Sequence, residues 1–303
     1  MRIVAALGGN ALLRRGDPYD AETQAAHVTE AVRALAPLTD RHELLITHGN
    51  GPQIGLLAAE STADRELPRP YPLDVLGAET QGMIGYWLAR ELRRAVPNRE
   101  IAAVLTTTVV AADDPAFARP AKFVGRGYTA AEAERVAAAY AWDMAMDGTA
   151  WRRVVASPEP RGIVELPTIG RLLDAGCVVI AAGGGGVPVL EGQGGPEGVE
   201  AVVDKDLTAA LMAERLEADA LLLLTDVPAV FRGYGTDRAR PLSHATPGQL
   251  RGLRLPAGSM GPKAEAAARF AAHRPGGYAA IGAMTDVAAL LTGGAGTRVE
   301  SPG

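Results

Sequence analysis

Short apolar segments alternate with longer amphipathic segments along the chain. The short segments are rich in Val, Ile and Leu and mostly uncharged on both faces, which is typical of strands buried in a parallel sheet. They cover Arg2–Leu7, Glu43–Ile46, Ile101–Val110, Val178–Ala182 and Leu221–Leu224. The longer segments repeat their apolar residues with the period of a helix and cover Ala21–Leu38, Leu73–Arg94, Leu207–Leu216 and Lys263–Ala272. This alternation predicts an α/β fold.

The segment 113–160 interrupts the alternation, since no strand-like run appears in it before Arg153–Ala156. Thr129 and Glu132 form a capping-box pattern, which predicts a helix that continues to about Met146. We interpret the segment as an insertion that forms a lid. The alternative is a further βα unit with an unusual loop.

We expect one domain over residues 1–303 with two halves. The N-terminal half, about 1–170, contains the insertion at about 113–160. The C-terminal half, about 171–303, begins again with a strand and a glycine-rich turn.

Composition excludes several classes of protein. A net charge of −5 argues against a nucleic-acid partner, which calls for clustered positive charge. The longest uncharged apolar stretch, Ala175–Leu190, is shorter than the roughly 20 residues of a membrane span and contains glycines and a proline. The first residues lack the pattern of a signal peptide, and the single cysteine, Cys177, lies in an apolar run that favours a packed thiol. We therefore expect a cytoplasmic protein without nucleic-acid or membrane partners.

Glycine-rich or polar turns follow four of the predicted strands. If the sheet is parallel, these turns lie together at its carboxyl edge, where open α/β sheets bind ligands. Glycines there let backbone N–H groups approach an anion closely. The sequence therefore predicts one site for phosphate or carboxylate groups, formed by Gly8-Gly9-Asn10, Thr47-His48-Gly49-Asn50-Gly51, Gly183-Gly184-Gly185-Gly186 and Thr225-Asp226-Val227.

Common nucleotide and metal motifs do not occur. The sequence has neither a G-x-x-x-x-G-K-[ST] motif nor a G-x-G-x-x-G motif. The five histidines lack ligand spacing, so we expect no metal held by protein side chains alone. The sequence leaves open the binding of magnesium together with a nucleotide, because that ion needs few protein ligands. His48 is interpreted as a residue that hydrogen-bonds loop backbone, with a catalytic base as the alternative.

The chain contains only three lysines, and each has an unusual setting. Lys122 precedes a glycine turn in the insertion, and Lys205 lies between the acids Asp204 and Asp206. Lys263 lies near a helix start, where an ammonium group opposes the helix dipole unless an anion shares the site. Phosphoryl transfer needs positive charge distributed around the transferring group and no nucleophile from the protein, so these lysines and backbone amides could support it. The alternative is three solvated surface lysines.

The chain resembles the carbamate kinases of the amino acid kinase superfamily over nearly its whole length. The resemblance is carried by Ala6–Ala11, His48–Gln53, Pro72–Asp74, Gln81–Tyr86, Trp151–Val155, Gly183–Pro188, Ala201–Asp206 and Gly258–Met260. It implies a three-layer αβα sandwich with a protruding lid subdomain. It also implies reversible phosphoryl transfer between carbamoyl phosphate and ADP giving ATP and carbamate, use of Mg²⁺ with the nucleotide, and a homodimer.

The resemblance also implies roles for single residues. Lys205 resembles the transition-state lysine, Asp204 the acid that orients it, and Lys122 the lid lysine. The substrate cradle is implied to be Gly8, Gly9, Asn10, Gly49, Asn50 and Gly51. The ATP or ADP side is implied to be Gly183, Gly184, Gly185, Gly186, Thr225, Asp226, Val227, Met260 and Lys263.

Two alternatives stay open. Phe123-Val124 stands where the family usually has Pro-Ile after the lid lysine, which favours a related kinase for another small oxyanion, such as a carboxylate or phosphonate. A non-catalytic nucleotide or amino-acid sensor is the other, although Lys122, Asp204 and Lys205 are all present. For the helix Leu73–Arg94, a two-fold interface and burial against its own sheet are both open.

Overall fold

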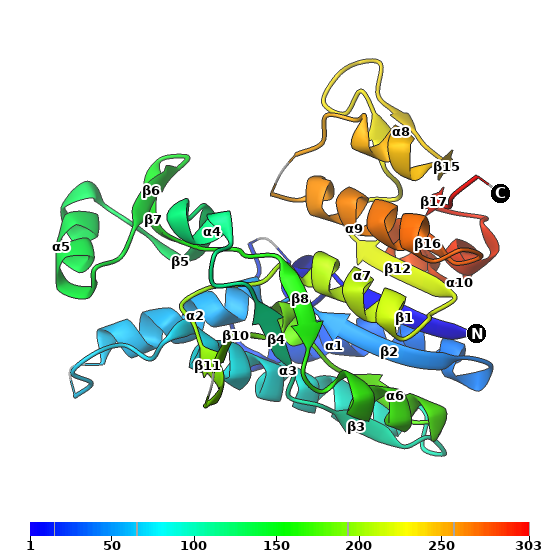
Figure 1. Cartoon of the computed structure of the whole chain (residues 1–303), viewed down its shortest axis with the longest axis horizontal. Coiled ribbons are helices and arrows are strands. Elements are labelled where there is room, and N and C mark those ends of the chain that lie inside the picture. Colours follow the sequence, from blue (N-terminus) through cyan, green and yellow to red (C-terminus); the bar gives the residue numbers. More distant parts are fainter. Residues whose placement is uncertain (15, 65, 193, 257, 303) are drawn as a thin grey trace.

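A sheet of eight strands forms the centre of the molecule (Figure 1). The computed structural model describes residues 1–14, 16–64, 66–192, 194–256 and 258–302. Within these residues, neighbouring strands of the sheet are parallel, with one antiparallel pair, β16 (Tyr278–Ala283) and β17 (Thr297–Val299). Their order is β15 (His244–Ala245), β17 (Thr297–Val299), β16 (Tyr278–Ala283), β12 (Ala220–Thr225), β1 (Arg2–Leu7), β2 (Glu43–His48), β9 (Val178–Ile180) and β3 (Ile101–Ala103). The predicted α/β class with a mainly parallel sheet is confirmed.

Helices cover both faces of this sheet, as a three-layer sandwich requires. On β1, Val4 and Ala6 pack against one helical layer, whereas Ile3, Ala5 and Leu7 pack against the other, and all are 0% exposed. The first layer contains α6 (Leu166–Asp174), α7 (Lys205–Arg215), α8 (Pro247–Arg251) and α9 (Met260–His273). The second contains α1 (Ala21–Leu35), α3 (Leu73–Ala95) and α10 (Val287–Thr292). Burial on both faces explains the continuous apolar runs of the sequence. None of the helices in the described ranges is long and apolar enough to cross a membrane.

The structure corrects one predicted strand, Ile101–Val110. Strand β3 ends at Ala103, and the chain then leaves the main sheet at Thr106, which is fully buried. Thr106 donates its N–H to Oε1 of Gln81 at 2.9 Å, and its Oγ1 accepts the N–H of Ala182 at 2.9 Å. These side-chain partners replace strand pairing at the bend. The chain continues in a second sheet with the order β11 (Gly195–Gly198), β10 (Val187–Gly192), β4 (Thr107–Val110) and β8 (Pro160–Ile163).

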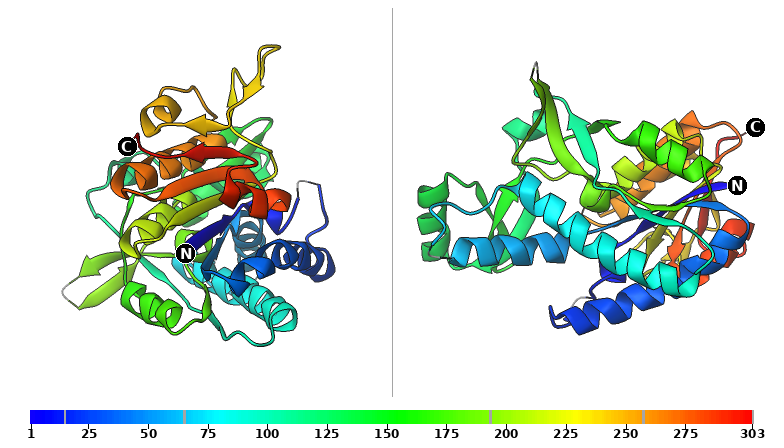
Figure 2. Two further views of the ribbon diagram at one scale, coloured as in Figure 1. Left: turned by 90° about the vertical axis from the view of Figure 1, so that its right-hand side faces the viewer. Right: turned by 90° about the horizontal axis from the view of Figure 1, so that it is seen from below.

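Residues 113–160, called the protruding segment below, stand out from the main body (Figures 1 and 2). They form an antiparallel sheet of their own, and the alternative of another βα unit is therefore wrong. The predicted capping box at Thr129 is present, but the helix ends at Tyr140 instead of Met146, because Ala141 adopts a left-handed conformation with φ of 56°. The elements are α4 (Pro115–Ala118), β5 (Lys122–Tyr128), α5 (Ala130–Tyr140), β6 (Met144–Asp147) and β7 (Ala150–Val155). The glycines and charges within β5 and the short length of β6 explain why the sequence did not predict these strands.

Candidate active site

Two glycine turns meet at the carboxyl ends of β1 and β2, which are neighbours in the main sheet. Gly8 and Gly9 follow β1, and Gly49 follows β2. A Cβ atom on Gly49 would lie 2.9 Å from the backbone nitrogen of Gly9. Only glycine permits this approach, so the two turns form one continuous backbone surface.

The second of these turns continues into a helix. Asn50 is the N-cap residue of α2 (Gly51–Ala63), and its Nδ2 donates to Oγ1 of Thr80 at 2.9 Å. The first amide groups of α2 therefore face the same edge of the sheet, where a helix N-terminus favours an anion. The side chain of Asn10 lies outside the part of the chain that the structure describes.

Asp206 joins two of the three lysines. Lys205 donates from Nζ to Oδ1 of Asp206 at 2.5 Å, and Lys263 donates from Nζ to Oδ2 at 3.2 Å. Lys205 begins α7, whereas Lys263 lies in the first turn of α9. The side chains are only 12%, 12% and 5% exposed for Lys205, Lys263 and Asp206. The two helices thus hold two ammonium groups beside one nearly buried carboxylate.

Burial and charge act in opposite directions on this cluster. Burial lowers the pKa of Lys205, and the charge of Lys263 acts in the same direction, whereas Asp206 opposes both. For Asp206, burial favours the neutral acid, but the two lysines outweigh it and hold the pKa below its ordinary value. Asp206 is therefore ionised, and a bound phosphate group would oppose the effect of burial on Lys205 by stabilising its charged form.

Asp204 contacts the third lysine instead of Lys205. As the N-cap residue of α7, Asp204 accepts the N–H groups of Asp206 at 2.9 Å and Leu207 at 3.4 Å through Oδ1. Its Oδ2 accepts from Nζ of Lys122 at 3.3 Å. Capping thus turns the carboxylate toward the protruding segment, and the orientation of Lys205 by Asp204 stays a prediction.

The three lysines line one small cavity of about 280 Å³ together with Gly9, Gly49, Asn50 and Gly51. Asp204 and Asp206 also line it. Three ammonium groups against two carboxylates leave one net positive charge on these side chains. The cavity therefore suits a small anion, with backbone amides on one side and lysines on the other.

A larger cavity of about 570 Å³ adjoins it and shares Gly9, Gly258, Ser259 and Lys263 with it. Its walls contain Gly8 and the residues predicted for the nucleotide side after β12 and at the start of α9, namely Thr225, Asp226, Val227, Met260 and Lys263. Phe231 of β13 (Phe231–Arg232), which pairs with β14 (Arg240–Pro241), adds an aromatic wall with Tyr234. The structure therefore brings these five residues together at one cavity, and nucleotide binding there stays a prediction.

The turn Gly183–Gly186 does not line the larger cavity, and its assignment to the nucleotide side stays a prediction. Gly184 lines the small cavity instead. Gly185 has a φ of 95°, and a Cβ on it would lie 2.4 Å from the carbonyl oxygen of Val203. Its own carbonyl accepts Oγ1 of Thr208 at 3.1 Å. The turn therefore supports the segment that leads to Asp204.

His48 is buried behind the site and contacts loop backbone, as predicted. Its Nδ1 lies 3.0 Å from the carbonyl oxygen of Gly49. Burial lowers the pKa of His48 to about 4, although the Gly49 contact opposes the shift. The ring does not line the small cavity with the lysines. A neutral, buried imidazole that contacts loop backbone fits a structural residue and not a base.

Asp206 is the site residue that the sequence analysis missed. The sequence did contain a pattern that points to Asp206, because Lys205 lies between two acids in Asp204-Lys205-Asp206. Spacing alone does not show which acid faces the ammonium group. The choice depends on Lys263, which lies 57 positions away in the chain and reaches the same carboxylate.

Comparisons with known proteins agree with this geometry. The model of the "Amino acid kinase family" matches residues 1–277. A carbamate kinase of Rhizobium meliloti is 49% identical over 305 residues, covering 99% of this chain and 94% of the relative. A solved carbamate kinase of Giardia lamblia bound to AMP-PNP superimposes with a TM-score of 0.92 at 34% identity, covering 99% and 98% of the two chains. A solved protein of Aeropyrum pernix gives a TM-score of 0.94 at 40% identity, covering 100% of both chains.

Proposed function

The chain belongs to the amino acid kinase family and catalyses the carbamate kinase reaction, and we propose that Lys122, Lys205 and Lys263 carry out this phosphoryl transfer. The reaction is the reversible transfer of a phosphoryl group between carbamoyl phosphate and ADP, which gives ATP and carbamate. The observation that carries the proposal is the meeting of two cavities at Lys263, one sized for a small anion and one twice as large.

Carbamoyl phosphate is assigned to the small cavity. Its phosphoryl group lies against the amides after Gly8, Gly9, Gly49 and Gly51, and the adenine nucleotide occupies the larger cavity beside Thr225–Val227 and Met260. An oxygen of the ADP β-phosphate attacks phosphorus, and the bond from phosphorus to the carbamate oxygen breaks. Carbamate leaves as an anion, so no proton has to move. This balance explains why a cluster of cations without a general base suffices.

Each lysine has a distinct role in this proposal. Lys205 and Lys263 are held by Asp206 and stabilise charge on the transferring group from the rigid side. Lys122 leaves Asp204 and contacts the same group from the protruding segment, which acts as a lid. Asp204 is thus the resting partner of Lys122.

Magnesium is proposed to enter with the nucleotide. Among the residues that the structure describes, no group of three His, Cys, Asp or Glu side chains is placed to hold a metal ion. Nucleotide phosphates and water supply the ligands that Mg²⁺ prefers, and the bound ion neutralises phosphate charge. We expect loss of ATP formation with a chelator and recovery with Mg²⁺ alone. Full activity without any divalent ion would contradict this assignment.

A homodimer is also proposed, on the resemblance alone. Its interface cannot use Ile84 and Leu88 of α3, because both are 0% exposed and pack against the chain's own sheet. Light scattering should give twice the chain mass of 31.4 kDa at micromolar concentration. A value near 31.4 kDa would contradict the dimer.

The deciding experiment is to mix the purified protein with ADP, Mg²⁺ and carbamoyl phosphate and to measure ATP. We expect ATP formation that is lost in Lys205→Met, with an unchanged melting temperature as the control for folding. Acetyl phosphate as the donor to ADP and a phosphonate as the acceptor from ATP, tested in parallel, address the related oxyanion kinase. Faster turnover of either compound than of carbamoyl phosphate would favour that alternative.

A further inference from the structure

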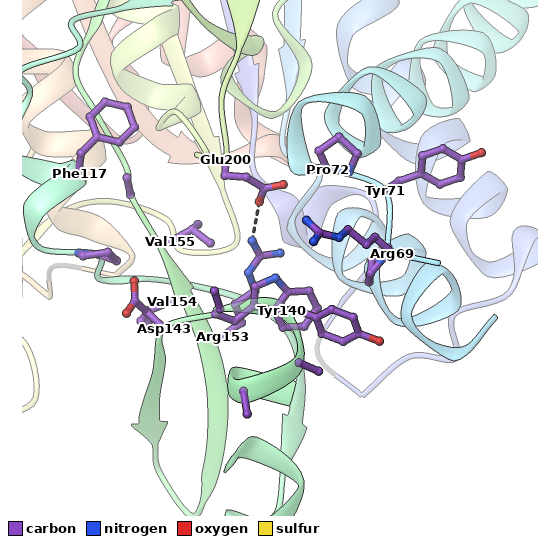
Figure 3. A pocket seen from close by; sticks show the side chains of 17 residues that line it. Arg69, Tyr71, Pro72, Phe117, Tyr140, Asp143, Arg153, Val154, Val155 and Glu200 are labelled. Carbon is purple, nitrogen blue, oxygen red and sulfur yellow. Dashed lines mark hydrogen bonds and ion pairs between the residues drawn. The ribbon is translucent and has the colours of Figure 1, made fainter. Parts of the chain in front are cut away.

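A cavity of about 760 Å³ separates part of the protruding segment from the main body (Figure 3). One ion pair crosses it. Arg153 of β7 donates from a terminal nitrogen to Oε2 of Glu200 at 2.5 Å. Beside the cavity, Val124 and Val155 of the protruding segment pack with Leu73 of the main body. Within the cavity, this ion pair is the contact that joins the two parts.

Arg153 is fixed firmly within the protruding segment. It lies on β7, the middle strand of the three-stranded sheet, with Val124 and Met144 as its strand partners. Its guanidinium lies 4.2 Å from the ring centroid of Trp142, and the residue is only 9% exposed. Trp142 in turn packs against the apolar cluster under α5. A movement of Arg153 is therefore a movement of the segment.

Glu200 is fixed to the main body. Its Oε1 accepts the N–H of Leu73, the first residue of α3, at 3.1 Å. Two residues on, the N–H of Val202 donates to the carbonyl of Ala156 in the protruding segment at 3.0 Å, so a backbone contact also joins the two parts. From Glu200 the chain runs directly to Asp204, the partner of Lys122.

The protruding sheet therefore holds the segment 200–204 at both of its ends. Arg153 holds Glu200, and Lys122 holds Asp204. The two cations come from adjacent strands, because Lys122 pairs with Val155 in the register of β5 and β7. During the reaction Lys122 must leave Asp204, and the pair of Arg153 and Glu200 is then the side-chain ion pair that maintains the alignment.

We propose that Arg153 is a positioning residue, which through Glu200 holds the protruding segment so that Lys122 reaches the transferring phosphoryl group. Arg153 does not line the small cavity, so it contacts neither substrate there. The inference rests on the proposed function of Lys122. An effect of Arg153 on turnover must then pass through Lys122, and this dependence can be measured.

The experiment is a double-mutant cycle on the full chain with Lys122→Met, Arg153→Met and the combined variant. We expect Lys122→Met to lower kcat by about 10²–10³ and Arg153→Met to lower it by about tenfold, as a small misplacement does. In the Lys122→Met background, Arg153→Met should change kcat less than about twofold. The KM for ADP should stay constant, because the larger cavity contains no residue of the protruding segment.

Two further variants keep the test decisive. Glu200→Gln should reproduce the effect of Arg153→Met in weaker form, and it keeps an oxygen for Leu73. Arg126→Met is the matched control, because Arg126 also pairs with a carboxylate, Glu132 at 3.7 Å, and lies 4.3 Å from the Tyr128 ring, but wholly within the protruding segment. It should leave kcat unchanged.

The outcomes separate the two proposals. If Lys122→Met leaves kcat unchanged, the proposed function of Lys122 is wrong. If Lys122→Met acts as expected but Arg153→Met and Glu200→Gln do not lower kcat, the positioning role is wrong. A tenfold loss from Arg153→Met that persists in the Lys122→Met background would also overturn it, because the effect would then bypass Lys122.

Discussion

The site holds its lysines in two different ways. Lys205 and Lys263 project from the starts of two helices that pack against each other, and Asp206 pairs with both in a nearly buried cluster. Lys122 projects from a strand of the protruding segment, its side chain is 43% exposed, and its carboxylate partner Asp204 lies 3.3 Å away. One part of the cation set is therefore rigid and the other adjustable.

This difference suits phosphoryl transfer. Preorganised cations stabilise the transition state without reorganising during the reaction, but a fully enclosed site could not admit two substrates. A rigid pair at the sheet edge and a third cation on a separate sheet satisfy both needs. The following changes should affect the two parts unequally.

Removing the shared carboxylate should have the largest effect on stability. Asp206→Asn leaves two buried ammonium groups without a counterion, so the free energy of unfolding should fall by about 3 kcal/mol. Asp204→Asn is the matched variant, because Asn also caps helices, and it should cost only a few tenths of a kcal/mol. Urea unfolding of both variants measures the contrast. Equal losses would show that the buried cluster is not the rigid part.

Replacing the lysines should separate turnover from binding. Lys205→Ala and Lys122→Ala should each raise the barrier by roughly 3–4 kcal/mol, which is about 10²–10³ in kcat. Lys122→Ala should also raise the KM for carbamoyl phosphate more than that for ADP, because lid closure is weakened. Steady-state ATP formation tests this, with thermal melts as controls. If Lys122→Ala keeps more than about a third of kcat/KM, the lid assignment fails.

Gly185→Ala should damage the rigid side through the backbone. The new Cβ would meet the carbonyl oxygen of Val203 at 2.4 Å, and φ of 95° is strained for any L side chain. We expect a loss of about 2–3 kcal/mol in the free energy of unfolding. Gly176→Ala, also at positive φ but with open space around its Cβ position, is the control and should cost about 1 kcal/mol. Similar losses would mean that the contact with Val203 is unimportant.

His48 should make stability depend on pH. The unfolded chain protonates this ring below its ordinary pKa of 6.5, whereas in the folded chain burial delays protonation to about 4. Protons therefore favour the unfolded state in this range, and stability falls as pH decreases from 6.5. Between pH 7.5 and 5 the loss should be about 2 kcal/mol. Urea unfolding of His48→Gln should show a smaller loss; an equal loss would assign the dependence to other groups.

Local patterns predicted much of the fold. The strand Arg2–Leu7 and the helix start at Ala21 were predicted at the residues where they occur, because apolar period and capping are local properties. The prediction of one strand over Ile101–Val110 was wrong. The run is divided by contacts of Thr106 with Gln81 and Ala182, which are distant in sequence and leave no local pattern. The protruding sheet was inferred only as an interruption, because β5 has the glycines and charges of a loop.

The sequence by itself determined which residue types could carry the chemistry, namely three rare lysines and a set of glycine turns after strands. It could not determine their partners. Asp204 and Asp206 are almost equivalent as sequence neighbours of Lys205, and only the cap of α7 turns the first toward Lys122 and the second toward Lys205 and Lys263. Ion pairs depend on where helices and strands distant in sequence meet, and packing in three dimensions decides that.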